Sequence, residues 1–303
     1  MRNHQRKTEA EAEYWNKEAA NKHCVPDIRN LDTNKDISYI WDDPVIEDIV
    51  RGEYRRFIIN KALEKKDGDV LEIGCGTGWL SLELARAGMN VKGLDLSEKR
   101  IAIAQRYFEQ LKKKENIKGA IDYIACPVQE VSFKKSVFDL IVCWDSLHHI
   151  QNIESIMKKT AQWLKSDGQL IIFEYIGLPF LNKIIIMIIY ALPMINKTGI
   201  LKKIRSKITN DNSTHKAPLE GITGLEMLRA VKRYLELKTF KTTLAISYYV
   251  APYICGNRSL KHKLVRLLKR LDDAITNLHF LRGQYIFLWA TKKSERPLTL
   301  RNV

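Results

Sequence analysis

The stretch VLEIGCGTGWL, residues 70–80, constrains the fold of this chain more than any other. A short apolar run comes first, and three glycines follow it at Gly74, Gly76 and Gly78. Glycines in such a place let the backbone turn tightly and let a ligand come close to it. The pattern of a helix then begins at Gly78. The stretch therefore predicts a buried strand, a ligand-binding loop and a helix in succession.

Strands and helices alternate after this loop. Short apolar runs predict strands at 69–75, 90–96, 121–126, 138–144 and 169–175. Amphipathic segments between them predict helices at 78–88, 97–114 and 153–168. This alternation is typical of βαβ units, and near-continuous apolar strands are typical of a parallel sheet covered on both faces. We therefore expect an α/β fold that binds its ligands at the carboxyl ends of the strands.

The segments outside this core suggest a division of the chain into four parts. Further helices are predicted at 8–22, 44–65, 184–192, 200–208 and 223–234, and two closing strands at 235–245 and 283–293. We expect an N-terminal helical lid (1–65), the α/β core (66–175), a helical insertion or substrate lid (176–222), and a part that completes the sheet (223–303) with a basic helical insertion at 247–282. The apolar run at 184–192 is too short to span a bilayer.

The glycine spacing narrows the kind of nucleotide that the loop binds. A dinucleotide fingerprint would place its third glycine at position 79, which is Trp79, and no Gly-Lys-Ser/Thr of a P-loop follows. Asp95 ends the next predicted strand, about 20 residues past the glycines, where a carboxylate accepts hydrogen bonds from ribose hydroxyls. The alternative for Asp95 is an N-cap of the following helix, near Ser97.

The whole of this region resembles a known family. Residues 66–175, with FDLIVCWDSLHHI at 138–150 and LKSDGQLIIFEY at 164–175, resemble the core of the class I S-adenosylmethionine-dependent methyltransferases of the small-molecule type. The resemblance implies a Rossmann-like methyltransferase fold with a mostly parallel seven-stranded sheet, an antiparallel last strand and helical insertions. It also implies an enzyme with S-adenosyl-L-methionine as its cofactor.

The resemblance assigns roles at the cofactor. It implies that Gly74 and Gly76 line the methionine end, that Glu72 orders their loop and reaches toward the amino group, that Asp95 holds the ribose and that Leu96 packs near the adenine. The full set that it implies is Glu72, Gly74, Cys75, Gly76, Gly78, Asp95, Leu96, Val128, Gln129 and Trp144.

The adenine end departs from the family pattern. The Asp-Ala pair that often follows the third strand falls on Pro127-Val128, so the usual carboxylate for the adenine amine is missing. The backbone N–H of Val128 remains as a donor to the ring, and Gln129 or Glu130 as the group for the amine.

Candidates for the chemistry follow the fourth and fifth strands. Methyl transfer is an in-line displacement that needs alignment and, for a hydroxyl acceptor, a base. The candidate catalytic residues are Asp145, His148, His149 and Glu174. The alternative for the two histidines is that they cap the next helix and pack the loop. Tyr14 and Trp15 belong either to a lid over the cofactor or to the core. No metal-ligand spacing is found, so no metal is expected.

The charge is concentrated in the C-terminal part. Residues 179–303 carry 23 Lys and Arg against 7 Asp and Glu, within a total net charge of +15. RSLKHKLVRLLKRL at 258–271 predicts an amphipathic helix whose leucines share one face. We expect that leucine face to pack on the domain or on the insertion at 176–222, with the basic face exposed to solvent. Docking on anionic lipid or a charged acceptor is the alternative. For residues 184–192 we expect a buried helix or a lid over an apolar acceptor pocket, with a membrane contact as the alternative.

Three functions follow from these observations. We expect a methyltransferase of biosynthesis that acts on a small-molecule or lipid-linked acceptor, at oxygen because the Asn-Pro-Pro-Tyr/Phe tetrad of amino-group methylation is absent. The alternatives are an RNA methyltransferase that uses its basic C-terminal half and a non-catalytic cofactor-binding or scaffold protein. The N-terminal residues have no secretory pattern and the five cysteines are scattered, which favours the cytoplasm, with a peripheral membrane location left open.

Overall fold

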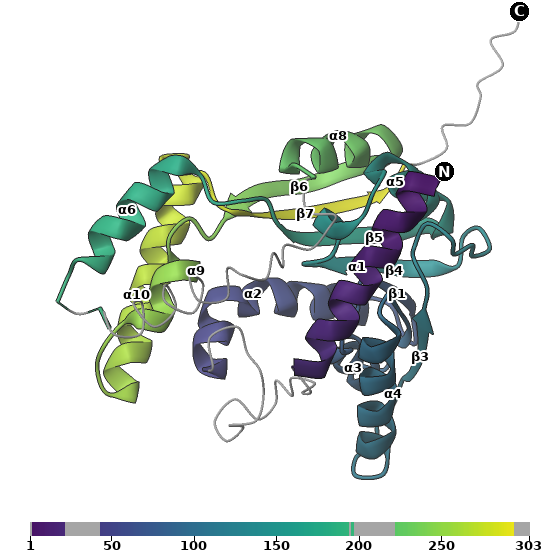
Figure 1. The fold of residues 1–303 in the computed structure, drawn as a ribbon. Coiled ribbons are helices and arrows are strands. Elements are labelled where there is room, and N and C mark those ends of the chain that lie inside the picture. The colour runs from purple at the N-terminus through teal and green to yellow at the C-terminus, as the bar shows by residue number, and fades with distance from the viewer. Residues whose placement is uncertain (1, 22–42, 194, 197–221, 294–303) are drawn as a thin grey trace, which may run out of the picture.

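The computed structural model describes residues 2–21, 43–193, 195–196 and 222–293 (Figure 1). Its centre is a seven-stranded sheet in the order β3-β2-β1-β4-β5-β7-β6. The strands are β1 (Asp69–Ile73), β2 (Asn90–Asp95), β3 (Ala120–Ala125), β4 (Phe138–Trp144), β5 (Leu164–Tyr175), β6 (Leu235–Thr243) and β7 (Tyr285–Lys292). Strands β1 to β5 pair in parallel, and β7 runs antiparallel to both β5 and β6. This is the predicted Rossmann-like methyltransferase fold.

The helices cover both faces of the sheet. They are α1 (Arg2–Asn21), α2 (Pro44–Leu63), α3 (Trp79–Arg86), α4 (Glu98–Lys112), α5 (Ile153–Trp163), α6 (Phe180–Tyr190), α8 (Gly224–Tyr234), α9 (Ser247–Val250) and α10 (Arg258–Asn277). On one face, Val70 and Val142 pack in a cluster with α2 and α3; on the other, Leu71 and Ile141 pack with α5 and α8. Consecutive side chains of a strand point to opposite faces, so both layers require the continuous apolar runs seen in the sequence.

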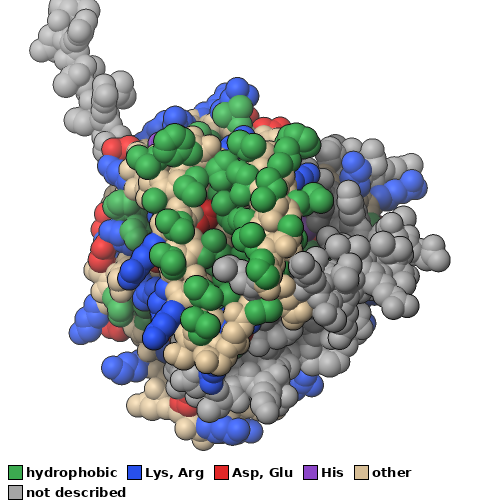
Figure 2. Space-filling view, turned by 90° about the vertical axis from the view of Figure 1, so that its left-hand side faces the viewer, with side chains coloured by type: hydrophobic (Ala, Val, Ile, Leu, Met, Phe, Trp, Pro, Cys, Tyr) green, Lys and Arg blue, Asp and Glu red, His purple; other side chains and the backbone are tan. Residues whose placement is uncertain are grey.

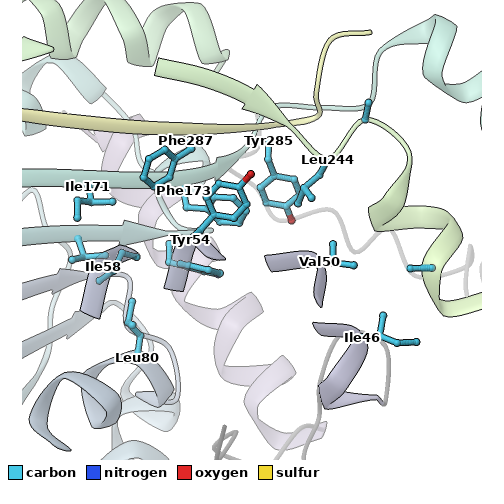
Figure 3. Packing of buried hydrophobic residues seen from close by; sticks show 14 of the residues in the cluster. Ile46, Val50, Tyr54, Ile58, Leu80, Ile171, Phe173, Leu244, Tyr285 and Phe287 are labelled. Atoms are coloured by element: carbon cyan, nitrogen blue, oxygen red, sulfur yellow. The ribbon is translucent and has the colours of Figure 1, made fainter. Parts of the chain in front are cut away.

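An aromatic stack joins α2 to the closing strands (Figure 3). The ring of Tyr54 stacks on Phe173 at 4.6 Å between centroids, and Phe173 stacks on Tyr285 at 4.8 Å. The hydroxyl of Tyr54 forms a hydrogen bond of 2.6 Å with Thr243 Oγ1, so its polar end is satisfied inside the core. This stack ties the N-terminal helix α2 to β5, β6 and β7.

The predicted helix at 153–168 is too long. Helix α5 ends at Trp163, and β5 begins at Leu164, which pairs with Phe138. The register then shifts, because the next pair joins Leu140 to Gln169. The residues between form an irregular segment in which Lys165 Nζ lies 2.7 Å from Asp139 Oδ2. In the sequence, the polar residues of this strand bulge resemble the last turn of the preceding helix. The predicted helix therefore extends too far.

The leucine face of α10 does not pack on the domain as a whole, which corrects the expectation from sequence. Leu264 and Leu268 are partly packed against the core, but Leu260, Leu267 and Leu271 are exposed. The side of α10 that faces the domain is mostly polar and is buried at His262, Val265, Lys269, Asp272 and Thr276. The reason lies in partners that are distant in sequence.

Those partners come from α2 and from the start of α9. Asp272 accepts hydrogen bonds from the backbone N–H groups of Ile246 and Ser247 at 3.0 and 2.9 Å. Lys269 Nζ lies 2.8 Å from Glu53 Oε1. These satisfied polar contacts fix the side of α10 that meets the domain.

The prediction of a buried helix at 184–192 is also wrong for one side of α6. Asn182 and Ile186 are buried, and Asn182 Nδ2 donates to the carbonyls of Ala245 and Arg282 at 3.1 and 2.8 Å. Met187 and Ile188 on the other side are exposed. The predicted helix at 200–208 lies outside the described residues.

Candidate active site

A cleft opens at the carboxyl ends of β1, β2 and β4, and it holds about 630 Å³ of space that is open to solvent. Seven of the residues named from sequence line it: Gly74, Asp95, Leu96, Val128, Gln129, Asp145 and His149. Seven others do not: Glu72, Cys75, Gly76, Gly78, Trp144, His148 and Glu174. Where the structure shows a role for one of these seven residues, that residue contacts backbone or side chains behind the residues that line the cleft.

The glycine loop is held in a backbone conformation that favours glycine. Gly74, Gly76 and Gly78 have φ values of 76°, 55° and 81°. A Cβ at Gly74 would lie 2.2 Å from Ser146 Cβ, and one at Gly78 would lie 2.2 Å from the hydroxyl of Tyr123. The N–H groups of Gly74 and Cys75 donate to Leu94 O at 2.7 and 3.0 Å. The loop is therefore tied to β2, with no side chain at Gly74 to fill the cleft.

Glu72 lies behind this loop. Its carboxylate is buried and accepts a hydrogen bond from the hydroxyl of Ser81. Burial raises the pKa of Glu72 to about 8. The structure thus connects Glu72 to the first turn of α3, and its reach toward a cofactor amino group stays a prediction.

Asp95 is placed as a ribose-binding carboxylate would be. Its Oδ2 accepts the N–H of Gly76 at 2.9 Å, and its Oδ1 accepts the N–H of Ser97 at 2.8 Å. Burial raises the pKa of Asp95. The N-cap of α4 is Ser97, whose Oγ accepts the N–H of Arg100 at 3.2 Å. The capping alternative therefore applies to Ser97, and Asp95 links the glycine loop to α4 at the wall of the cleft.

Helix α1 lies in front of the sheet beside α4 (Figure 1), and its Thr8 and Trp15 line the cleft. Asn16 Oδ1 accepts from Ser97 Oγ at 2.7 Å and from the N–H of Lys99 at 3.2 Å. The Trp15 ring lines the cleft, with the guanidinium carbon of Arg100 3.9 Å from its centroid. These contacts hold α1 to the start of α4, which is where a lid over the cofactor would sit.

A buried carboxylate connects α1 with the loop after β4. Glu11 Oε1 accepts from Trp15 Nε1 at 2.7 Å and lies 3.1 Å from His149 Nδ1. The rings of Trp15 and His149 meet edge to face at 5.0 Å. His149 therefore lies between α1 and the cleft.

Asp145 has a strained position and a free oxygen. Its φ is 48°, in the left-handed region that non-glycine residues seldom adopt. Its Oδ2 accepts from Arg51 Nη1 at 2.8 Å, and Arg51 also pairs with Glu47. The other oxygen, Oδ1, is buried and has no hydrogen-bond partner among the described residues. Burial, partly opposed by Arg51, raises the pKa of Asp145 to about 6.

Glu174 holds the loop that follows β4 through hydrogen bonds. Its fully buried carboxylate accepts the N–H groups of Ser146 and Leu147, each at 2.8 Å, and lies 2.7 Å from His148 Nδ1. Glu174 is thus committed to backbone and to His148, away from the cleft. This arrangement favours a positioning role for Glu174 and His148, with Asp145 and His149 left at the cleft itself.

Along the wall of the cleft where the resemblance predicts the adenine, none of the described lining residues carries a carboxylate. Cys126, Pro127, Val128 and Gln129 form that wall. The carbonyl of Gln129 accepts from Lys159 Nζ at 2.6 Å, which fixes the backbone and leaves the amide side chain of Gln129 uncommitted to this contact.

Sequence reasoning missed several lining residues: Thr8, Ile73, Leu94, Arg100, Cys126, Ser146 and Ile150. Arg100 had a usable signal, because it lies in the first turn of the helix that follows Asp95. Thr8 had none, since it reaches the cleft only through the packing of α1 on α4. Across the described part of the chain, no group of His, Cys, Asp or Glu could hold a metal ion.

Comparison with known proteins identifies the core. The family model described as "Methyltransferase domain" matches residues 71–172. Residues 71–172 belong to the methyltransferase domain family. The domain is of the class I S-adenosylmethionine-dependent type. The left-handed glycine loop and the acceptor oxygens of Asp95 fit that cofactor.

A curated relative matches the same part of the chain. The ubiquinone biosynthesis O-methyltransferase of Dechloromonas aromatica (strain RCB) is 32% identical over 149 residues, which are 47% of this chain and 61% of that protein. The match thus spans about three fifths of the relative's length. It supports the methyltransferase domain.

Solved structures share the fold over most of its length. A geranyl diphosphate C-methyltransferase from Streptomyces coelicolor A3(2), in complex with Mg²⁺, geranyl diphosphate and S-adenosyl-L-homocysteine, superposes with a TM-score of 0.56 at 18% identity and covers 95% of this chain and 98% of its own. The [4+2]-cyclase SpnF superposes with a TM-score of 0.50 at 14% identity, over 79% of this chain and 80% of its own. At these identities the likeness concerns the fold alone, and function is argued from the site.

Proposed function

We propose that this protein transfers a methyl group from S-adenosyl-L-methionine to an oxygen atom of a small-molecule or lipid-linked acceptor. The observation that carries the proposal is the free Oδ1 of Asp145, buried at the cleft beside the glycine loop. A carboxylate there accepts a proton from a hydroxyl acceptor.

Different residues of the chain bind the cofactor, accept the proton and exclude water. The glycine loop and Asp95 hold the cofactor, which supplies an electrophilic methyl on its sulfonium. Asp145 would take the proton of the acceptor hydroxyl. When bound, the cofactor would supply the methyl group to the acceptor oxygen, and its sulfur would keep the electron pair of the broken C–S bond. Arg51 orients Asp145 through its hydrogen bond of 2.8 Å. Trp15 and His149 close the cleft and exclude water.

Transfer to oxygen has two supports. The relative from Dechloromonas aromatica is named an O-methyltransferase. The loop after β4 reads WDSL, without the Asn-Pro-Pro tetrad of amino-group methylation. A general base with a pKa of about 6 suits an acidic hydroxyl such as a phenol better than an amine, which is already nucleophilic when neutral.

Two measurements test the proposal. Calorimetry with S-adenosyl-L-homocysteine should give saturable binding, and a radiolabelled-methyl assay with a panel of phenols, with and without polyprenyl chains, should give labelled ether products. Absence of cofactor binding would overturn the proposal. Binding without transfer to any phenol, or transfer to RNA in its place, would also overturn the oxygen assignment.

A further inference from the structure

Helix α10 is oriented in an unusual way for an amphipathic helix. Its buried side carries Lys269 and Asp272, both satisfied by partners on α2 and α9. Its outward side carries Leu267 and Leu271, which are 54% and 53% exposed. Amphipathic helices usually bury their apolar stripe. The described residues therefore leave the outer part of the apolar stripe of α10, at Leu260, Leu267 and Leu271, uncovered.

Helix α6 repeats this arrangement with almost no charge. Phe180 and Met187 are 77% and 72% exposed, and they share one side of the helix with Ile184. Lys183 is the one charged residue among FLNKIIIMIIY. Asn182 holds the opposite side of α6 to the segments that precede α9 and β7. Both helices thus use polar contacts inward and apolar side chains outward.

The two apolar sides lie on one surface of the molecule. Figure 2 shows that surface, which is the left-hand side of Figure 1, as a broad hydrophobic area with Lys and Arg along its borders. We call it the α6–α10 face and define it by Phe180, Ile184, Met187, Leu267, Leu271 and Leu278. A contiguous exposed apolar patch on a protein that must stay dispersed marks an interaction site.

The charged residues that α6 and α10 place at the border of this face are Lys and Arg. Lys263, Arg266 and Arg270 are exposed along one edge of the leucine stripe, and Lys183 is exposed beside Met187. The acids of α10, Asp272 and Asp273, lie toward the domain, where Asp273 pairs with Lys269 at 2.6 Å. The border is therefore cationic without local compensation from α6 or α10.

We propose that the α6–α10 face docks on the surface of an anionic phospholipid bilayer. Apolar side chains enter the acyl boundary, and the Lys and Arg border pairs with lipid phosphates. A soluble acidic protein would fit the cationic border, but two separate helices that both present bulky aliphatic and aromatic side chains match a fluid apolar layer. No described helix has the length and apolar character to cross a bilayer.

This inference is independent of the proposed methyl transfer. It needs neither the cofactor nor an acceptor, and vesicle binding can be measured without either. If both hold, the cleft works near a surface where amphiphilic acceptors concentrate.

The test is flotation of the full-length protein with vesicles of phosphatidylcholine that contain about one third phosphatidylglycerol. The wild type should float with these vesicles, and binding should fall as salt rises. Leu267→Gln with Leu271→Gln should weaken binding at least about tenfold, because each leucine would lose a large part of its transfer free energy. Arg266→Glu with Arg270→Glu should weaken it by a similar factor and flatten the salt dependence.

Matched controls come from exposed sites away from this face. Leu63→Gln removes an exposed leucine from the C-terminal end of α2, and Lys112→Glu with Lys113→Glu reverses exposed charge at the end of α4. Both should leave flotation unchanged. Cofactor binding by calorimetry should be equal in every variant, which confirms that each is folded.

Three outcomes would overturn the inference. The first is no flotation of the wild type at low salt, and the second is equal flotation of the wild type and both test variants. The third is a wild type that forms a dimer in solution which only Leu267→Gln with Leu271→Gln dissociates, since the face would then belong to a second copy of this chain. The inference is supported only if the wild type binds the vesicles and both test variants lose that binding.

Discussion

Polar side chains are oriented in opposite ways in the cofactor cleft and on the α6–α10 face. In the cleft, polar side chains border the open space: Asp95 and Asp145 line it, and Asp145 Oδ1 has no hydrogen-bond partner among the described residues. On α6 and α10, the polar groups Asn182, Lys269 and Asp272 point into the protein, and the apolar side chains point out. The difference teaches that the direction of a side chain reflects which partners lie within reach, and that hydrophobicity alone does not set it.

The largest expected effect concerns the free oxygen of Asp145. Asp145→Asn should lower kcat by roughly 10²–10⁴-fold, the usual contribution of a general base. In the wild type, kcat/KM should fall as the pH drops through about 6, because protonation removes the base. The variant should lose this acid limb. The same limb in Asp145→Asn would show that another group is the base, and His149→Gln is the comparison that tests His149.

A smaller effect is expected at the ribose position. Asp95→Ala should weaken S-adenosyl-L-homocysteine binding about 10–100-fold, because a charged acceptor of hydrogen bonds contributes about 1.5–3 kcal/mol. Asp122→Ala is the matched control, since Asp122 is an exposed acid on the neighbouring strand β3. Calorimetry that finds equal affinity in both variants would contradict the role of Asp95.

The smallest effects compare the two sides of α10. Lys269→Met should lower the free energy of unfolding by about 1–2 kcal/mol, a modest loss because Glu53 and Asp273 keep some contact with water. Leu267→Ala should change it by less than about 0.5 kcal/mol, as at other exposed sites. Urea unfolding measures both. A larger loss in Leu267→Ala than in Lys269→Met would mean that α10 docks through its leucines.

The core could be predicted from sequence because its signals are local. Strand β4 has the predicted bounds, and the glycine loop is defined by residues within one short stretch. The start of α8 also depends on close neighbours in the chain, because Thr223 Oγ1 accepts the N–H of Glu226 at 3.2 Å. Each of these depends on neighbours in the chain, which a single sequence displays.

The rest could not be predicted because it depends on partners far along the chain. Arg51 and Asp145 come together from distant parts of the chain. Nothing in the sequence near either residue indicates that the other is its partner. The leucines of α10 were expected to face inward, but Glu53 and Ser247 supply the contacts that turn the polar side in. An amphipathic pattern predicts that a helix has two sides, and tertiary partners determine which one meets the core.

The insertion that carries α10, residues 244–284, leaves β6 and enters β7 at neighbouring positions of the sheet. Thr243 of β6 pairs with Tyr285 of β7, and a Cβ at Gly283 would lie 2.0 Å from the backbone nitrogen of Thr243. The sheet thus holds both ends of 244–284 together whatever the segment between them contains. Over evolution, the outer side of such a segment can be rewritten or exchanged while the strand register, and with it the cofactor cleft, is inherited unchanged.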